Sequence, residues 1–392
     1  MNDDIEISAA LWRPQVDPRF TEEIRLYAAA EIAPQADDID RDDVYPVAIM
    51  KALAAKGYST ATLDTRYGGD GKSYAHAVAI FEELSVASAA VGISLITIFQ
   101  AQTMLRLFGS DSLKDRYLPL FSKGLLSSYS LTEANHGSDI RHLDTKARVE
   151  GGEWVLNGEK SFITSGSAAE FFIILAETDQ GVSVFALPRD TPGLTIYKGH
   201  TAATFGLRNG PHMNMRLENV RLPLDHLVGT EGKGVRQAVT VLDYSRTLAG
   251  AISVGIARAA FEGALKFARN RVAFDKKVLD FQGIQWYFAD MLTDIDASRL
   301  LIYAAADALD RHDSIDRYSS EAKLKACAVA TEVASKAVQI CGAYGTTENA
   351  PFGRYLRDAK AYEIAGGSAE VLKNTIGKFL LAGLTKQALK PR

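Results

Sequence analysis

The segment from Thr145 to Thr164 has the sequence TKARVEGGEWVLNGEKSFIT and decides the fold class. Its first part alternates small or apolar residues with charged ones, which is the two-residue period of a half-buried strand. Gly151-Gly152 and Asn157-Gly158 are residue pairs typical of tight hairpin turns. The segment therefore predicts strands near 145–150, 154–156 and 162–164 that follow one another as hairpins.

Further short apolar runs extend this pattern on the C-terminal side. They cover Phe171 to Leu175, Val182 to Leu187 and Met213 to Leu217, and Gly, Pro or Asp residues bound them. Short strands separated by such residues are typical of small all-β units. We expect a middle antiparallel β-barrel-like domain at residues 125–230.

The two flanking parts contain long stretches without proline, from Pro46 to Pro119 and from Pro223 to Pro351. Because proline removes a helix donor and clashes with the preceding turn, these stretches permit long helices. One amphipathic stripe in the last third has the spacing i, i+4, i+7, i+11 and consists of Ile284, Phe288, Met291 and Ile295. The order helix, strand, helix in separate blocks predicts an α+β protein rather than a doubly wound nucleotide-binding fold. The expected domains are an N-terminal all-α domain at 1–124, the β domain at 125–230 and a C-terminal helical domain at 231–392.

The composition favours a protein that acts on small molecules. The 392 residues include 44 basic and 48 acidic side chains, for a formal net charge of −4, and no local run of Lys or Arg suggests nucleic-acid binding. Two cysteines and seven scattered histidines show no metal-ligand spacing, so no metal is expected. The acidic N-terminus does not resemble a signal peptide, and we expect a cytoplasmic protein. The uncharged stretch 85–105 is expected to be a buried core helix rather than a membrane span.

Known catalytic motifs of other classes are absent from the sequence. Gly71-Lys72-Ser73 ends like a phosphate-binding loop, but Arg66 occupies the position of its first glycine. No G-x-S-x-G or H-E-x-x-H motif occurs.

Five segments in fixed order resemble the acyl-CoA dehydrogenase family of flavoproteins. They are LTEANHGSD at 131–139, NGEKSFIT at 157–164, RVAF at 271–274 with FQ at 281–282, QICGAYG at 339–345 and RDAK at 357–360. With the order of helical and strand blocks, the resemblance extends over almost the whole chain. The resemblance implies that the C-terminal domain is a four-helix bundle, that FAD is bound non-covalently, and that the substrate is an acyl thioester.

The resemblance also implies roles for individual residues. Around the isoalloxazine it places Tyr129, Leu131, Thr132, Phe162 and Thr164, and on the pyrophosphate Ser138. The resemblance implies that a neighbouring subunit contributes the residues that bind the ADP half of the cofactor, namely Arg271, Phe274, Gln282, Gln339, Gly342 and Gly345. It also implies that Ser368 and Glu370 lie at the closing edge of the cofactor site. A guanidinium suits a diphosphate because it donates two parallel hydrogen bonds. Two positions depart from the family pattern: Ala134-Asn135-His136 replaces Pro-x-Ala, and Asp275 replaces a glycine.

The catalytic base of the family is missing. In the family a glutamate removes the α-proton of the thioester while the β-hydrogen passes to the flavin as hydride. The resemblance locates this glutamate at Gly366 or at Ser245, just before Arg246, and neither residue is a carboxylate. The N–H of Gly366 could still polarise the thioester carbonyl. Glu363 and Asp243 are the nearest carboxylates in sequence and are therefore candidate bases.

Three functions remain open. The first is an acyl-thioester dehydrogenase or reductase acting on acyl-CoA or on an acyl or peptidyl carrier protein, with Arg246 and the cofactor motifs in its favour. The second is a flavin-dependent monooxygenase or oxidase of the same fold, which needs no α-proton base. The third is a non-catalytic flavin-binding subunit. The resemblance further implies a redox partner such as an electron-transfer flavoprotein, and a homo-oligomer built as a dimer of dimers.

Overall fold

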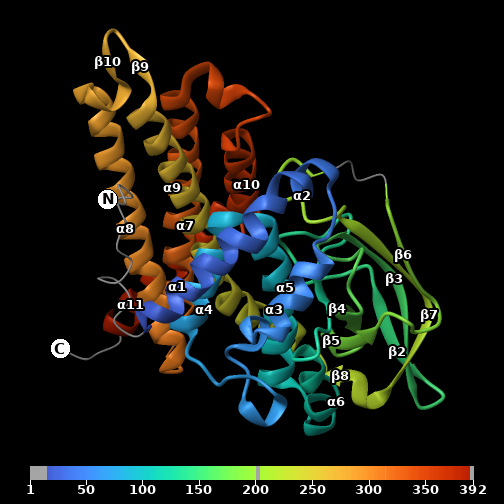
Figure 1. Ribbon diagram of the computed structural model, residues 1–392. Helices are drawn as coiled ribbons and strands as arrows, with labels where there is room; N and C mark the ends of the chain where they lie inside the picture. The colour runs from blue at the N-terminus through green and yellow to red at the C-terminus, as the bar shows by residue number, and fades with distance from the viewer. Residues whose placement is uncertain (1–15, 200–203, 314, 389–392) are drawn as a thin grey trace.

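The structure is a computed structural model that describes residues 16–199, 204–313 and 315–388, with side chains described up to 381. Figure 1 shows the strands of the middle sheet gathered on one side of the molecule and the long C-terminal helices on the other, with α3 and α5 between them. The expected α+β class, with a helical part, a sheet and a second helical part, is confirmed.

The N-terminal part is helical. Its elements are α1 (Pro18–Tyr27), η2 (Ala28–Ile32), η3 (Ala33–Gln35), α2 (Ala36–Asp42), α3 (Val47–Ala55), η4 (Tyr58–Thr60), η5 (Thr65–Tyr67), α4 (Tyr74–Ala87), α5 (Ala89–Phe108) and α6 (Asp111–Phe121). The uncharged stretch 85–105 is not one helix, because Ser88 is extended with φ −157° and separates α4 from α5. Both sides of this break are buried, so the stretch lies in the core as expected.

The middle part is a mixed sheet. Its strands are β1 (Ser127–Ser130), β2 (Lys146–Glu150), β3 (Glu153–Ile163), β4 (Phe171–Thr178), β5 (Gly181–Pro188), β6 (Leu194–Tyr197), β7 (Met213–Pro223) and β8 (Leu227–Val228), with η6 (Leu224–His226) before β8. The order is β6-β7-β3-β2-β4-β5-β8, and β1 pairs with β4. The predicted antiparallel arrangement is wrong for two pairs, because β1 and β2 both run parallel to β4. In both cases the chain returns to the same end of the sheet through a long connection, which parallel pairing requires.

The predicted turn at Asn157-Gly158 is also wrong. Strand β3 continues through both residues, and its pairing with β7 shifts register between Leu156 and Gly158. Gly158 has φ +147°, and a Cβ there would lie 2.5 Å from the Cα of Thr145. The glycine therefore marks a β-bulge that lies against a neighbouring backbone. An Asn-Gly pair occurs both in hairpin turns and at such bulges, so the pair alone does not show which of the two forms.

The C-terminal part consists of long helices. Its elements are α7 (Gly234–Asn270), β9 (Val272–Ala273), β10 (Lys276–Lys277), η7 (Val278–Asp280), α8 (Gln282–Asp310), α9 (Asp316–Cys341), η8 (Gly342–Thr346), α10 (Phe352–Ile364) and α11 (Ala369–Ala388). Helices α7 to α10 pack on one another as the expected four-helix bundle, and α11 lies against α9. The predicted stripe lies on α8, where Phe288, Met291 and Ile295 are buried.

Within the described part of the chain, two helices, α5 and α7, have the length and composition that a membrane span requires. Their most apolar windows are 78% and 83% buried inside the structure. Both helices belong to one large core cluster that joins the N-terminal and C-terminal helices, while a second cluster fills the sheet. Helix α5 also contacts β1 and β4, so it connects the helical parts with the sheet.

Candidate active site

The ends of β1 and β3 lie side by side, although they are about thirty residues apart in the chain. The N–H of Ser161 donates to the carbonyl of Thr132 at 2.9 Å, and the hydroxyl of Ser128 donates to the carbonyl of Thr164 at 2.7 Å. The structure thereby brings together the predicted isoalloxazine residues, which are Tyr129, Leu131, Thr132, Phe162 and Thr164. The hydroxyl of Tyr129 donates to the carbonyl of Ala238 at 3.4 Å and ties this region to α7.

Phe162 has two unusual properties for a large aromatic residue. Its backbone is left-handed, with φ +54°, and its side chain is 55% exposed. Such a conformation is costly outside glycine and is concentrated at functional sites. An uncovered aromatic ring beside Thr164 fits a planar apolar ring system such as an isoalloxazine. The residues present at this position therefore fit a flavin.

A buried ion pair holds the loop that follows β1. The ammonium of Lys160 lies 2.7 Å from Glu133 Oε1, and the two side chains are 0% and 2% exposed. Glu133 also accepts the N–H groups of Asp144 at 2.6 Å and Thr145 at 3.1 Å. Burial lowers the pKa of Lys160 to about 8 against the attraction of Glu133, so the ammonium stays charged at neutral pH. The ion pair thus gives one structural reason for the glutamate of the 131–139 motif and the lysine of the 157–164 motif.

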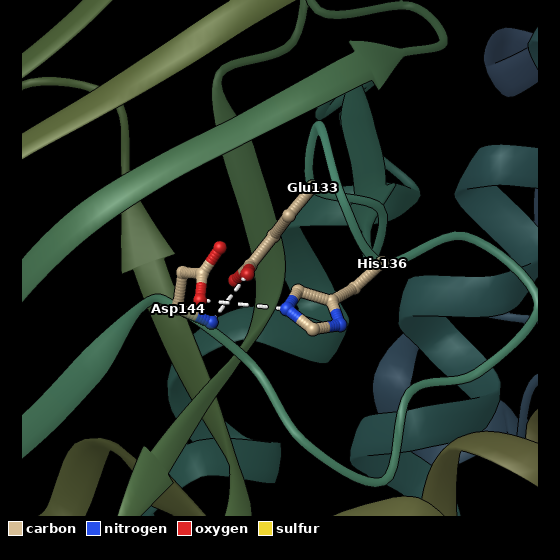
Figure 2. A group of neighbouring side chains, drawn as sticks. All are labelled: Glu133, His136 and Asp144. Atoms are coloured by element: carbon tan, nitrogen blue, oxygen red, sulfur yellow. Dashed lines mark hydrogen bonds and ion pairs between the residues drawn. The ribbon is translucent and has the colours of Figure 1, made fainter.

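Glu133, His136 and Asp144 form a cluster that has the residue types of a metal site (Figure 2). The Nε2 of His136 lies 3.4 Å from Asp144 Oδ1. The carboxylate of Glu133, however, already accepts from Lys160 and two backbone N–H groups. A cation here would face the buried ammonium of Lys160, so the cluster is explained as a loop anchor.

One face of α5 connects the sheet to α7. The hydroxyl of Thr97 donates to Ser165 Oγ at 3.2 Å, and the amide of Gln100 donates to Ser245 Oγ at 3.2 Å. Since a helix rises 1.5 Å per residue, these contacts are about 5 Å apart along α5. The β3 end and Ser245, the second of the two positions at which the family glutamate was expected, therefore lie along the same face of α5. Sequence reasoning missed Gln100 as a partner of Ser245.

Gly366 lies in the short loop between α10 and α11. Gly366 and Gly367 have φ values of +70° and +111°, which favour glycine, and Gly366 is exposed. The buried guanidinium of Arg246 supports this loop from α7, because a Cβ on Gly367 would lie 3.4 Å from its Nη2. The structure thus places the predicted residue Arg246 against the loop that contains Gly366, next to Gly367.

The two candidate bases lie in different surroundings. Asp243 is buried, and its Oδ1 accepts from Arg246 Nη1 at 2.8 Å and from Ser319 Oγ at 3.2 Å. Burial raises the pKa of Asp243 to about 6, and the charge of Arg246 opposes this rise. Asp243 therefore faces α9, whereas Ser245 faces α5. Glu363 lies on α10 and accepts from Lys360 Nζ at 2.7 Å.

A second group of predicted residues lies far from the sheet. Figure 1 shows β9 and β10 at the opposite end of the long helices from the strands. This end carries the residues assigned to the ADP half, namely Arg271, Phe274, Gln282, Gln339, Gly342 and Gly345. Phe274 is 89% exposed, and Phe274 and Asp275 have φ values of +53° and +62° in the β9–β10 turn. One chain does not bring these residues to the β1 and β3 ends.

The remaining predicted cofactor residues lie on connecting segments. Ser138 is exposed on the loop between β1 and β2. Ser368 and Glu370 lie at the start of α11, where the backbone N–H of Glu370 and then the hydroxyl of Ser368 lower the pKa of that carboxyl.

The RDAK segment joins distant parts of the chain. Asp358 is buried on α10 and accepts the N–H of Leu207 at 2.6 Å, while Arg357 pairs with Asp40 of α2. A Cβ on Gly206 would lie 2.2 Å from the carbonyl oxygen of Arg357, so the 206–207 backbone must pack closely on α10. Asn209, in the same loop, donates to Ser94 Oγ at 2.9 Å and to Ser165 Oγ at 3.3 Å. Sequence reasoning missed Asn209, because no motif marks it.

Comparisons with known proteins agree with this arrangement. The N-terminal, middle and C-terminal domain profiles of the acyl-CoA dehydrogenases match residues 17–124, 128–220 and 232–381. The probable acyl-CoA dehydrogenase FadE25 of Mycobacterium tuberculosis is 32% identical over 376 residues, which are 94% of this chain and 96% of that protein.

Solved structures extend the likeness to the fold. The butyryl-CoA dehydrogenase of Megasphaera elsdenii superposes with a TM-score of 0.90 at 32% identity, covering 93% of this chain and 97% of that chain. The prolyl acyl carrier protein oxidase AnaB has a TM-score of 0.88 at 26% identity, covering 92% and 98%. From the three matched domains and the full-length relatives, it follows that the chain belongs to the acyl-CoA dehydrogenase family.

Proposed function

We propose that the chain is a FAD-dependent oxidoreductase that exchanges hydrogen between the α and β carbons of an acyl thioester and the flavin. The observation that carries this proposal is that hydrogen bonds join the ends of β1 and β3, where the exposed ring of Phe162 lies beside Thr164. Relatives named acyl-CoA dehydrogenases at 32% identity over nearly the whole chain support the same reaction class. The flavin, when bound, supplies the hydride acceptor or donor.

The chain's own residues then bind and polarise the thioester. Thr132 and Thr164 would hold the flavin edge, and Ser138 would reach its pyrophosphate. The N–H of Gly366 makes no hydrogen bond within the described part of the chain and is therefore free to donate to the thioester carbonyl. A donor aimed at a developing oxyanion is worth about 10²–10³ in rate. Arg246 supports the loop that carries this N–H.

Proton removal is assigned to Asp243 or Glu363. Asp243 has a pKa of about 6 because of its burial, which suits a general base near neutral pH. Glu363 is three residues from Gly366 on the same segment, and its partner is the surface group of Lys360. Asp243→Asn and Glu363→Gln separate the two candidates. We expect at least a 100-fold loss of turnover in one of them, and full activity in both would exclude both.

Anaerobic titration with acyl thioesters tests the reaction. We expect bleaching of the flavin absorbance, or a long-wavelength charge-transfer band, with at least one member of a panel of acyl-CoAs and acyl carrier proteins. The thioester carrier is itself part of this test, because a solved relative is named a prolyl acyl carrier protein oxidase. No spectral response to any thioester would contradict the proposal.

A flavin-dependent oxidase or monooxygenase is the second candidate. It is favoured by Gly366 and Ser245, which occupy both family positions of the glutamate without supplying a carboxylate. Oxygen consumption that depends on reduced flavin, in the absence of thioester oxidation, would identify this activity. Tight FAD binding without either response would identify the third candidate, a non-catalytic flavin-binding subunit.

We further propose the assembly, location and domain limits of the protein. Residues for the ADP half lie at the opposite end of the bundle from the β1 and β3 ends, so a complete cofactor site needs a second copy of the chain. This supports a homo-oligomer built as a dimer of dimers, which light scattering tests. An electron-transfer flavoprotein is the proposed redox partner, the cytoplasm the proposed compartment, and 1–124, 125–230 and 231–392 the proposed domains.

A further inference from the structure

Lys323 is a buried lysine whose contacts are unusual. It lies on α9, and its side chain is 0% exposed. Its ammonium donates to the carbonyl of Tyr362 at 3.1 Å and to the carbonyl of Gly367 at 2.8 Å. Among the ion pairs of residues 16–381, none includes Lys323, and nearby Glu363 is bonded to Lys360 instead. Burying an ammonium is costly, so its contacts with these two carbonyls call for a specific explanation.

The two carbonyls lie at the two ends of the loop that contains Gly366. Tyr362 is in the last turn of α10, and Gly367 precedes α11. One side chain from a third helix therefore bridges both ends of the segment 363–366. The loop also rests on this side chain directly, because a Cβ on Gly366 would meet Lys323 Cε at 3.9 Å.

The loop needs such a bridge because its own sequence gives it little rigidity. Two successive glycines lose more conformational entropy on ordering than other residues do, by about 0.5–1 kcal/mol each. Neither glycine has a side chain that could anchor the loop by packing. An N–H that polarises a carbonyl must nevertheless keep its direction within about 10–20°.

We propose that Lys323 is a positioning residue for the thioester. By holding the carbonyls of Tyr362 and Gly367, it fixes the 363–367 loop so that the N–H of Gly366 faces the substrate carbonyl. This inference rests on the proposed function, because it assigns the thioester to Gly366. Lys323 touches neither the flavin nor the substrate in this role.

Lys323→Met tests the proposal with a side chain of similar length that cannot donate. Lys325→Met is the matched control, because Lys325 is two residues away on α9, is 42% exposed and pairs with Asp294 at 2.7 Å. Both lysines line the same groove of about 400 Å³ beside α11. The first readout is hydrogen–deuterium exchange in the FAD-loaded protein without substrate. We expect the amides of 364–367 to exchange at least 10-fold faster in Lys323→Met and at the wild-type rate in Lys325→Met.

The second readout is the absorption maximum of a bound conjugated enoyl thioester, cinnamoyl-CoA. Polarisation of its carbonyl by the loop N–H shifts this maximum to the red on binding. In Lys323→Met we expect the red shift to fall to half or less of the wild-type value and kcat to fall 10- to 100-fold, while KM changes less than threefold. Lys325→Met should keep all three values.

The outcomes separate this inference from the proposed function. Wild-type exchange rates at 364–367 in Lys323→Met overturn the positioning role, whatever the activity. Faster exchange with a full red shift and full kcat also overturns it, because the loop would then move without consequence for the carbonyl. If the protein processes no thioester, the exchange measurement still decides whether Lys323 holds the loop. If Lys323→Met does not fold, Lys323→Gln is measured instead. Its neutral amide lies on a side chain one atom shorter than that of lysine and should not reach both carbonyls, so an exchange rate equal to that of the wild type overturns the proposal in the same way.

Discussion

Replacing Lys160 with methionine removes one partner of the ion pair that anchors the loop after β1. The pair is buried on both sides, with side chains 0% and 2% exposed and an N–O distance of 2.7 Å. In Lys160→Met, the carboxylate of Glu133 stays buried without its countercharge. It keeps the two backbone N–H groups of Asp144 and Thr145 at 2.6 and 3.1 Å. The variant therefore tests how strongly the loop depends on one contact.

The size of the effect follows from this geometry. Breaking a buried pair by removing one partner costs about 3–5 kcal/mol, and the remaining N–H donors place this case near about 3 kcal/mol. At about 2 °C per kcal/mol for a protein of this size, the melting temperature should fall by roughly 6 °C. Because the same loop carries Thr132, affinity for FAD should fall with it.

Thermal unfolding at pH 7 and a flavin fluorescence titration measure both effects. Lys146→Met is the control, because Lys146 lies on the neighbouring strand β2 and pairs with Glu177 at 2.9 Å while 61% exposed. An exposed pair contributes at most about 1 kcal/mol, so this control should melt within roughly 2 °C of the wild type. In the double variant Lys160→Met with Glu133→Gln, the buried charge is gone and part of the loss should be recovered. If Lys160→Met melts no lower than Lys146→Met, the anchoring role of the pair is refuted.

Three further substitutions test other features of the structure. Gly158→Ala places a Cβ 2.5 Å from the Cα of Thr145 at φ +147°, so we expect about 3 kcal/mol of destabilisation in urea, and a wild-type midpoint would argue against the bulge. Asp358→Asn tests the buried carboxyl of Asp358. Burial raises the pKa of this group to about 6. The pKa of Asp358 in the folded protein lies above the unfolded value of about 3.9. The protonated carboxyl therefore contributes its full stabilisation below pH 4, and the free energy of unfolding of the wild type falls by up to about 3 kcal/mol as the pH rises through 6. The variant should therefore match the wild type at pH 4 and melt higher at pH 7, and the opposite order would contradict the sign. Asp275→Gly relieves a left-handed backbone at φ +62° and should stabilise the protein by about 1 kcal/mol, with an unchanged or lower melting temperature counting against strain in this turn.

The local sequence predicted the architecture because helix and strand periods, glycine pairs and proline spacing act over a few residues. It located the strands at 171–175, 182–187 and 213–217 and the stripe on α8, which the structure confirms. It failed where one local signal has two tertiary uses. Asn157-Gly158 suits a turn as well as a bulge, and only the neighbouring backbone of Thr145 selects the bulge. The extended Ser88 and the parallel pairing of β1 likewise depend on packing between segments.

The sequence by itself also determined the identity of the motif residues, since the resemblance rests on residues in fixed order. It did not determine which of them meet. Only the tertiary structure placed Thr132 beside Ser161, separated the Arg271 group from the sheet, and turned Asp243 toward α9 while Ser245 faces α5. Lys323 and Gly367 are 44 residues apart, and no periodicity or spacing connects them. Such contacts arise when helices pack, because burial then brings together side chains and carbonyls that the chain itself keeps far apart.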